Sequence, residues 1–299
     1  MYDVIIIGAG CAGMTAALYA LRAGKSVLLL EGNSVGGQIA SSPRVENIPS
    51  IMEISGYDFA DALFEQVTAH GADFELETVE KIEKRAERDF VVTTDYGAHE
   101  GRSVIIATGV KHRKLGLDKE DELRGVSYCA VCDGAFYKGR EVALVGDGNS
   151  ALQYALLLSN YCTKVYIYTM FDKFFGDKVL IDALSKRDNV EITRNVIAVE
   201  LIGDKELTAV RFRETNGTAS FVKEVPALFV AIGQLPENKV FADLVELSPD
   251  GYIAAKDDCK TSMEGVWAAG DCRTKKIRQL TTAAADGAVS ALGACDYLR

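Results

Sequence analysis

Two cysteines and an aspartate stand close together in the segment GVSYCAVCDGAFYKG. Cys129 and Cys132 are separated by two residues, a spacing at which two thiols can form a reducible disulfide. A Cys-x-x-Cys pair at the start of a helix also lowers the pKa of one thiol, which favours thiolate chemistry. Asp133 follows directly and is placed to move a proton as the pair opens. The segment therefore predicts a redox-active disulfide.

Spacing alone leaves two other interpretations of the pair open, half of a zinc site or two buried cysteines. A zinc site needs about four ligands, but no second Cys-x-x-Cys exists and His70, His99 and His112 show no ligand spacing. No metal site is predicted. The total of seven cysteines is odd and does not suggest a secreted disulfide framework. The remaining five are interpreted as small buried residues: Cys11, Cys162, Cys259, Cys272 and Cys295.

A glycine fingerprint near the N-terminus predicts a dinucleotide site. Gly8, Gly10 and Gly13 lie between an apolar strand and a helical pattern. Glycines at this spacing let the backbone approach a pyrophosphate, which then meets the N–H groups at the helix N-terminus. Glu31 ends the next strand, about 20 residues on, where a carboxylate can accept hydrogen bonds from a ribose diol.

The same layout returns in the middle of the chain, where Gly146, Gly148 and Ala151 follow a second apolar strand. A second feature is also repeated, since the apolar strands at 102–109 and 225–233 both end in a glycine turn. We therefore expect an α/β fold with two Rossmann-like domains, each doubly wound in three layers, with a parallel sheet flanked by helices.

A third apolar strand, at 264–271, has no fingerprint of its own, so the economical arrangement folds it back onto the first sheet. A long helix rich in small residues is expected after it, at 281–294. The second domain is then inserted in the first, and the chain crosses near Gly116 and near 244–249. The predicted domains are a discontinuous one of residues 1–113 and 246–299 and an inserted one of residues 114–245.

Nearly end to end, the chain resembles the low-molecular-weight thioredoxin reductases, a group of flavoprotein disulfide reductases. The resemblance implies FAD as the cofactor, with Asp271 bonded to its ribityl chain. Family positions that hold FAD are matched here, beside Gly8, Gly10, Gly13 and Glu31, by Gly36, Gly37, Gln38, Asn47, Ala107, Thr108, Gly109, Gly270, Asp271, Arg278 and Gln279.

The family pattern around the cysteines is Cys-Ala-Thr-Cys-Asp-Gly, and this chain departs from it only at Val131. The resemblance implies that Cys132 faces the flavin and that Cys129 attacks the disulfide of a protein substrate, thioredoxin. It also implies a homodimer.

The second fingerprint lacks the residues with which NADPH-dependent members hold the 2′-phosphate. Where those members carry His-Arg-Arg and a further Arg, this chain has Thr169, Met170, Phe171 and Phe175. Neither Met nor Phe replaces the planar, bidentate guanidinium that recognises a phosphate. NADH would need an acid at the strand end, and only Asp172, past the turn, is a candidate.

Three further departures accompany the missing arginines. Asp147 lies between the two glycines, where the family has glycine, and Gln153 and Tyr154 replace an acidic pair. These departures resemble the ferredoxin-dependent flavin thioredoxin reductases, which implies reduced ferredoxin as the electron donor. A cluster of cations after Asp271 is the expected docking patch for this acidic partner: Arg273, Lys275, Lys276 and Arg278.

Composition excludes several classes of function. The formal net charge of −10 argues against binding to nucleic acid or to an anionic membrane surface. The N-terminal apolar run is too short for a signal peptide, so a cytoplasmic protein is expected. Three rival functions share the fold: an NADPH-dependent thioredoxin reductase, a flavin dithiol oxidase that uses oxygen, and a non-catalytic flavin redox sensor.

Overall fold

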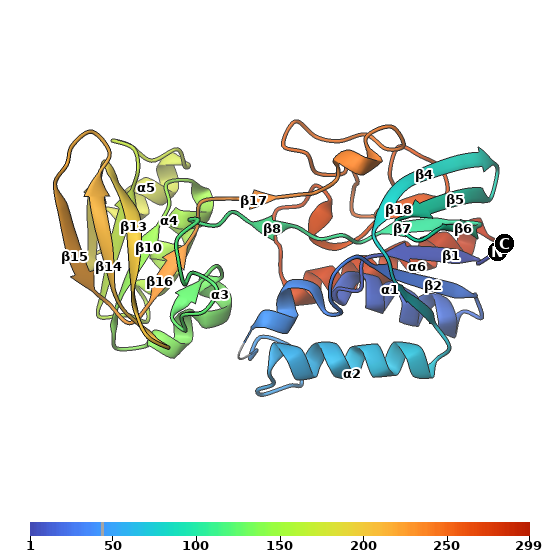
Figure 1. Cartoon of the computed structure of the whole chain (residues 1–299), viewed down its shortest axis with the longest axis horizontal. Helices are drawn as coiled ribbons and strands as arrows, with labels where there is room; N and C mark the ends of the chain where they lie inside the picture. Colours follow the sequence, from blue (N-terminus) through green and yellow to red (C-terminus); the bar gives the residue numbers. More distant parts are fainter. Residues whose placement is uncertain (43–44) are drawn as a thin grey trace. The chain divides into compact units, whose positions relative to one another are not determined.

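The chain forms two compact units, and the computed structural model describes residues 1–42 and 45–299. The first unit comprises Met1–Lys111 and Leu235–Arg299, and the second comprises His112–Gln234. Figure 1 shows the elements of both units with their labels. Within the described ranges, no helix is both long and apolar enough to cross a membrane.

The first unit is built on a five-stranded parallel sheet in the order β18-β7-β1-β2-β3. Its strands are β1 (Val4–Ile7), β2 (Val27–Glu31), β3 (Asp73–Leu76), β7 (Val104–Ile106) and β18 (Val266–Ala268). The pairing of β18 with β7 confirms that the apolar strand after residue 263 returns to the first sheet. Its central strands are continuous apolar runs because both faces of the sheet are buried.

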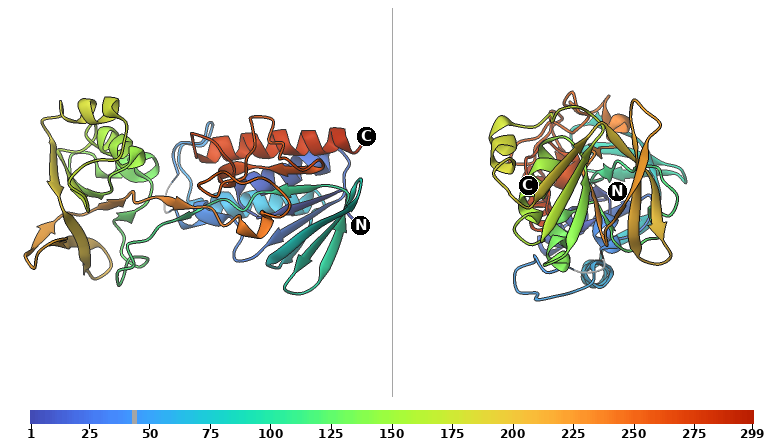
Figure 2. Two further views of the ribbon diagram at one scale, coloured as in Figure 1. Left: turned by 90° about the horizontal axis from the view of Figure 1, so that it is seen from above. Right: turned by 90° about the vertical axis from the view of Figure 1, so that its left-hand side faces the viewer.

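Helices cover one face of this sheet, and a three-stranded antiparallel sheet covers the other (Figure 1). Side chains alternate between the faces, so that Ile6 packs among the helices and Ile5 packs towards the antiparallel sheet. In Figure 2, α6 is the long red helix that ends near the C-terminus. The covering elements are α1 (Cys11–Arg22), α2 (Gly56–Ala69), α6 (Leu280–Tyr297), β4 (Val79–Ala86), β5 (Asp89–Thr94) and β6 (Ala98–Gly101).

The second unit repeats this plan with a parallel sheet in the order β12-β11-β10-β16-β9 and an antiparallel sheet in the order β13-β14-β15. Val142 and Leu144 pack against helices, whereas Ala143 and Val145 pack towards the antiparallel sheet. The elements are β9 (Val126–Ser127), α3 (Ala130–Asp133), η2 (Gly134–Tyr137), β10 (Glu141–Val145), α4 (Asn149–Leu158), β11 (Lys164–Thr169), α5 (Lys178–Leu184), β12 (Val190–Arg194), β13 (Val196–Gly203), β14 (Leu207–Glu214), β15 (Ser220–Glu224) and β16 (Leu228–Val230).

The remaining elements are short and lie in the connections: η1 (Gly37–Ser41), β8 (Lys111–His112), β17 (Gln234–Leu235), η3 (Lys239–Phe241) and η4 (Gly270–Cys272). The predicted α/β fold class with two Rossmann-like parallel sheets is confirmed. The antiparallel sheet that replaces helices on one face of each parallel sheet was not predicted. Its strands carry less regular apolar patterns than the buried parallel strands do.

The second crossing of the chain lies earlier than the predicted boundary at residue 245. Residues 235–245 belong to the first unit, because Phe241 and Val245 are buried in its core together with Ile253. The first crossing differs from the predicted boundary by two residues, since Lys111 ends the first segment where residue 113 was expected.

We expect Phe241→Ala to lower the free energy of unfolding by about 3 to 5 kcal/mol, because it removes a buried ring from the core of the first unit. Val240→Ala is the matched control, since Val240 is exposed in the same helical turn and should change the stability by less than about 1 kcal/mol. Chemical denaturation followed by circular dichroism measures both. Equal stabilities of the two variants would contradict the place of residues 235–245 in this core.

Candidate active site

Cys129 and Cys132 form a disulfide, as the sequence predicts, with their Cα atoms 5.3 Å apart. Cys129 is the N-cap of α3, and its sulfur accepts a hydrogen bond of 3.2 Å from the backbone N–H of Cys132. Ala130 is buried against the helices of the second unit, whereas Val131 points outward and is 45% exposed. The N–H of Cys132 therefore faces the Cys129 sulfur, where it favours a thiolate once the disulfide opens.

Asp133 is half-buried beside the disulfide, and within the described residues one side chain, that of Ser127, bonds it. Its Oδ2 accepts a hydrogen bond of 2.6 Å from the hydroxyl of Ser127. Its Oδ1 is buried and finds no hydrogen-bond partner in the described part of the chain. Burial raises the pKa of Asp133, and the bond from Ser127 opposes that rise. A carboxyl group in this state can hold and release a proton closer to neutral pH than an exposed aspartate can.

The five other cysteines are free and buried, as predicted. Within the described residues, His, Cys, Asp and Glu side chains form no group of three that is placed to share a metal ion.

The glycine turn after β1 meets two different demands. Gly8 has a φ of +106°, and a Cβ there would lie 2.4 Å from the carbonyl oxygen of Ala107. A Cβ at Gly13 would lie 1.8 Å from the oxygen of Gly8, so both positions are required by backbone packing. A Cβ at Gly10 would meet nothing closer than 3.9 Å. Gly10, the N-cap of α1, thus leaves open space at the helix N-terminus, where an anion is favoured.

Glu31 lies at the end of β2 with its carboxylate against this turn. Oε2 accepts a hydrogen bond of 2.8 Å from the N–H of Ala9, and Oε1 accepts one of 2.9 Å from Asn33. Each carboxylate oxygen has a second lone pair, so the side chain can still accept from a ribose diol. Gly36 closes the other side of the turn, since its N–H donates to the oxygen of Ala9 at 2.8 Å. Gly37 follows in the left-handed conformation.

Three further predicted positions line the strand ends of the first sheet. Gln38, in η1, donates a hydrogen bond to the carbonyl of Val110. Thr108 donates to the side-chain oxygen of Asn238 at 3.3 Å. Gly109 has a φ of +65°, and a Cβ there would meet no atom within 4 Å. The backbone after β7 therefore leaves open space at Gly109, beside the glycine turn that follows β1.

The C-terminal residues of the prediction gather at the start of α6. Gln279 caps this helix and accepts a hydrogen bond of 3.2 Å from the amide of Asn47, so two segments far apart in sequence meet. The guanidinium of Arg278 stacks over Tyr252, 4.2 Å from the ring centre, and donates to the backbone oxygen of Asp271 at 3.3 Å.

Asp271 carries an unsatisfied carboxylate oxygen. Its Oδ1 is buried with no hydrogen-bond partner in the described residues, and it follows Gly270 in η4. Burial raises the pKa of Asp271 to about 6, although Lys275 and Arg278 oppose the rise. An isolated buried acceptor is costly unless a donor arrives. The hydroxyl groups of a sugar alcohol would supply such donors, so this position fits the ribityl chain of a flavin.

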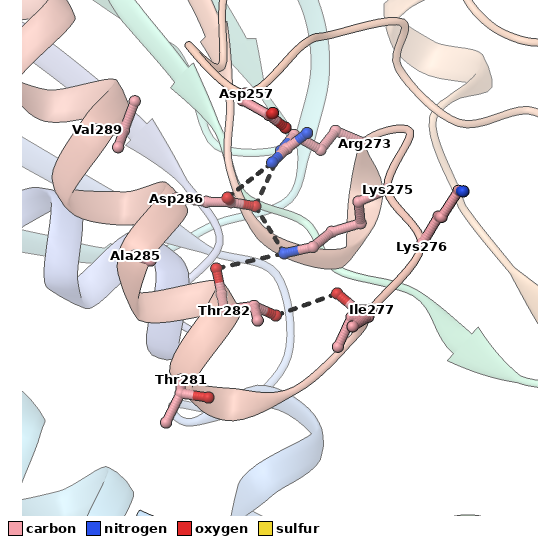
Figure 3. Close-up of a pocket in the computed structure, with 10 residues that line it drawn as sticks. All are labelled: Asp257, Arg273, Lys275, Lys276, Ile277, Thr281, Thr282, Ala285, Asp286 and Val289. Atoms are coloured by element: carbon pink, nitrogen blue, oxygen red, sulfur yellow. Dashed lines mark hydrogen bonds and ion pairs between the residues drawn. The ribbon is translucent and has the colours of Figure 1, made fainter. Parts of the chain in front are cut away.

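The predicted basic patch is wrong for two of its four cations (Figure 3). Arg273 is buried and donates two hydrogen bonds to Asp286, at 2.9 and 2.8 Å. Lys275 binds Asp286 at 2.8 Å and the carbonyl of Thr282 at 3.3 Å. Lys276 alone of these three points away from the cluster. The ion cluster borders a cavity of about 450 Å³ and anchors the loop after β18 to α6, so it serves the fold.

The second glycine turn keeps the backbone packing of the first and adds a carboxyl group, that of Asp147. A Cβ at Gly146 would lie 2.4 Å from the oxygen of Ala231, so this glycine is required by the backbone. Burial raises the pKa of Asp147 in the turn. At the end of β11, the hydroxyl of Thr169 accepts from the N–H of Phe171 at 3.2 Å instead of facing outward.

Exposed apolar side chains surround that strand end. Met170, Phe171 and Phe175 are 49%, 39% and 58% exposed, and the two phenylalanine rings pack edge to face. The two residues that stand in place of the family's acidic pair have different surroundings. Gln153 is exposed, whereas the hydroxyl of Tyr154 lies 3.5 Å from the backbone oxygen of Tyr128, next to the disulfide.

Sequence reasoning missed three polar residues that hold this site. Asn238 is fully buried and donates to the carbonyls of Gly251 and Cys272. Glu120 accepts hydrogen bonds from three consecutive backbone N–H groups and from the hydroxyl of Tyr128. Ser127 bonds Asp133. None belongs to a motif, and the only sequence signal for Ser127 is its place two residues before a reactive cysteine.

Fold and site together define a flavoprotein disulfide reductase. Residues 2–287 match the family described as pyridine nucleotide-disulphide oxidoreductase, to which the chain belongs, and members of this family use a flavin. All of this chain aligns with 94% of the thioredoxin reductase of Listeria innocua at 39% identity over 301 residues. Within the family, the chain belongs to the low-molecular-weight thioredoxin reductases, and it carries their Cys-x-x-Cys disulfide.

Two other relatives extend the comparison. The crystal structure of thioredoxin reductase from Streptococcus pyogenes is similar over 100% of this chain and 98% of that one, with 36% identity and a TM-score of 0.94. A protein of Clostridium pasteurianum described as a 34.2 kDa protein in a rubredoxin operon is 38% identical, over 99% of this chain and 97% of that protein.

We expect Asp271→Asn to stabilise the flavin-free protein at neutral pH by at most about 3 kcal/mol. The pKa of Asp271 is raised to about 6 in the fold, so the folded state binds more protons than the unfolded state between about pH 4 and 6. The stability that this group contributes therefore falls as the pH rises through that window, and asparagine removes the loss. Urea unfolding at pH 4.5 and 7.5 measures the effect.

The exposed Asp250, changed to Asn, is the matched control and should alter the stability little at either pH. The same Asp271→Asn variant should release its flavin more readily, which fluorescence of the released cofactor would report. A variant that is equally stable to the wild type at both pH values would contradict the buried, unpartnered state of this carboxylate.

Proposed function

We propose that this chain is an FAD-dependent thioredoxin reductase that takes its electrons from reduced ferredoxin rather than from NADPH. The observation that carries this proposal is the end of β11, where exposed apolar side chains replace the arginines of NADPH-dependent members. Met170, Phe171 and Phe175 offer no hydrogen bond to a phosphate. A dinucleotide would lose its main source of affinity there.

Two carboxylates near the start of α4 add to this argument. Asp147 lies in the turn, and the N–H of Phe175 donates to its backbone oxygen at 2.8 Å. Asp177 exchanges two hydrogen bonds with the side chain of Asn149, the first residue of α4, at 2.6 and 3.1 Å. A carboxylate about 4 Å from a phosphate costs about 1 kcal/mol in water and several at lower dielectric. Both charges therefore oppose a pyrophosphate at this helix N-terminus.

The first unit offers what a flavin requires. The open space at Gly10, the carboxylate of Glu31 and the unpartnered oxygen of Asp271 fit a pyrophosphate, a ribose and a ribityl chain in turn. Bound FAD would supply the exchange between single electrons and an electron pair. Two ferredoxins, one electron each, and two protons would then convert the disulfide to a dithiol. A donor near about −400 mV and a couple near about −270 mV release roughly 6 kcal/mol for two electrons.

The roles of the cysteines follow from the family resemblance and agree with their surroundings. Cys129 accepts the N–H bond at the start of α3, which suits it to be the thiolate that attacks the disulfide of thioredoxin. Cys132 is the partner that faces the flavin, and Asp133 holds a proton. One relative, from Clostridium pasteurianum, is described as a protein of a rubredoxin operon. We further propose a homodimer in the cytoplasm.

One observation favours a second candidate, the NADPH-dependent reductase. Arg194 ends β12 in register with Thr169, and its exposed guanidinium lies 5.9 Å from the ring centre of Phe174. This single arginine reaches the neighbourhood in which a 2′-phosphate would lie. If it serves that purpose, Arg194→Ala should raise the KM for NADPH at least tenfold and leave the KM for NADH unchanged.

Anaerobic titration of the purified flavoprotein distinguishes the donors. We expect the flavin absorbance to bleach with stoichiometric reduced ferredoxin, and to remain unchanged for minutes with micromolar NADPH or NADH. Denaturation should release one FAD per chain. Rapid bleaching by NADPH, with none by ferredoxin, would overturn the proposal in favour of the NADPH-dependent reductase.

We expect Cys129→Ser and Cys132→Ser each to abolish thioredoxin reduction while flavin stays bound, because the flavin positions lie in the other unit. Cys132→Ser should accumulate a mixed disulfide between Cys129 and thioredoxin, which mass spectrometry detects. Cys162→Ser is the control, since this buried thiol of the same unit is not paired. Turnover at a near wild-type rate in either of the first two variants would show that the pair is wrongly assigned.

A further inference from the structure

A buried serine joins the nucleophilic cysteine to the neighbouring acid. Ser127 lies at the end of β9 and is 5% exposed. Its Oγ is 2.6 Å from Oδ2 of Asp133, 3.1 Å from the backbone nitrogen of Cys129 and 3.4 Å from the backbone oxygen of Cys129. One hydroxyl therefore contacts both ends of the short redox segment.

The hydroxyl has a single proton, which decides the direction of these bonds. The shortest contact is to the carboxylate, and a bond to an ionised acceptor is roughly twice as strong as a neutral one. Ser127 therefore donates to Asp133 and accepts from the N–H of Cys129. If Asp133 takes up a proton, it can donate to Ser127, whose own proton is then free to turn to the Cys129 carbonyl. The two states of the acid thus correspond to two hydrogen-bond patterns around Cys129.

In the described part of the structure, no cation helps Ser127 to lower the pKa of Asp133. The pKa of Asp133 is raised by burial and lowered only by the bond from Ser127. Burial together with the charge of Asp133 raises the pKa of the phenols of Tyr137 in η2 and Tyr154 in α4. Neither phenol titrates near neutral pH, so Ser127 is the group that can tune Asp133 there.

We propose that Ser127 is a positioning residue that sets the protonation state of Asp133 and transmits it to the backbone of Cys129. The proposal rests on the proposed role of Asp133 as proton carrier. Opening the disulfide takes two electrons from the reduced flavin and leaves two thiolates, which need two protons to become the dithiol. When the disulfide opens, Asp133 supplies one of these protons and solvent supplies the other. Ser127 then stabilises the carboxylate that remains on Asp133.

The test uses the flavin-loaded enzyme reduced with dithionite, so that its outcome does not depend on the natural donor. Stopped-flow mixing with oxidised thioredoxin gives the rate of dithiol oxidation between pH 5 and 9. Asp133→Asn should remove one pH midpoint from the wild-type profile. That midpoint is then assigned to the titration of Asp133. In Ser127→Ala we expect this midpoint to rise by about one unit, because the ionised carboxylate loses its donor.

Threonine and valine form the matched pair at this position, since they have nearly the same shape and only threonine keeps the hydroxyl. Ser127→Thr should keep the midpoint within about 0.3 units of the wild type, and Ser127→Val should shift it as Ser127→Ala does. If Ser127→Ala loses its flavin, the threonine and valine variants decide the question alone. Ser127→Ala in the Asp133→Asn background should add no further change to the profile.

Two outcomes overturn the inference. A rate that falls by the same factor at every pH in Ser127→Ala, with the midpoint unmoved, means that Ser127 only braces the turn. A wild-type profile that Asp133→Asn leaves intact removes the proton-carrier role of Asp133 and the role of Ser127 with it. Neither result bears on the choice between ferredoxin and NADPH, which the titration with those donors decides.

Discussion

Both units depend on the same constraint, the close approach of one backbone to another where two parallel strands end. A Cβ at Gly8 would lie 2.4 Å from the oxygen of Ala107, and a Cβ at Gly146 would lie 2.4 Å from the oxygen of Ala231. Only glycine fits at such distances, and both positions have positive φ. The glycine is therefore needed for the fold before any ligand is considered.

Because of this constraint, a glycine fingerprint does not by itself show that a dinucleotide binds. The first glycine of the second unit is required by backbone packing, whereas the end of β11 carries exposed apolar side chains. In the first unit the strand end keeps Glu31, whose carboxylate also binds the N–H of Ala9 and so supports the turn itself. The glycine fingerprint is thus evidence of the fold. The residues at the end of the following strand are evidence of whether a dinucleotide binds.

The parts that could be predicted from sequence are those that neighbouring residues determine. The glycine turns, the apolar strands and the disulfide each depend on spacings of a few residues, and the structure contains all of them. Arg273 and Lys275 resembled an exposed basic segment because their counter-ion, Asp286, lies 13 and 11 residues further on, in α6, and cannot be identified by pattern. Asn238 was missed for the same reason, since it bonds backbone groups 13 and 34 residues away. The antiparallel sheets were missed because their strands carry less regular apolar patterns.

Three carboxylates that are buried or half-buried, those of Asp286, Asp271 and Asp133, differ in what the chain provides for them. Burial alone would raise the pKa of Asp286, but the bonds from Arg273 and Lys275 hold it below its usual value, so its charge is fully compensated within the fold. Asp271 and Asp133 each keep one oxygen without a partner in the described residues, and burial raises the pKa of both. A fold tolerates such a cost where the missing donor comes from outside the chain. At Asp271 that donor fits a flavin hydroxyl, and at Asp133 it fits the proton that opening of the disulfide requires.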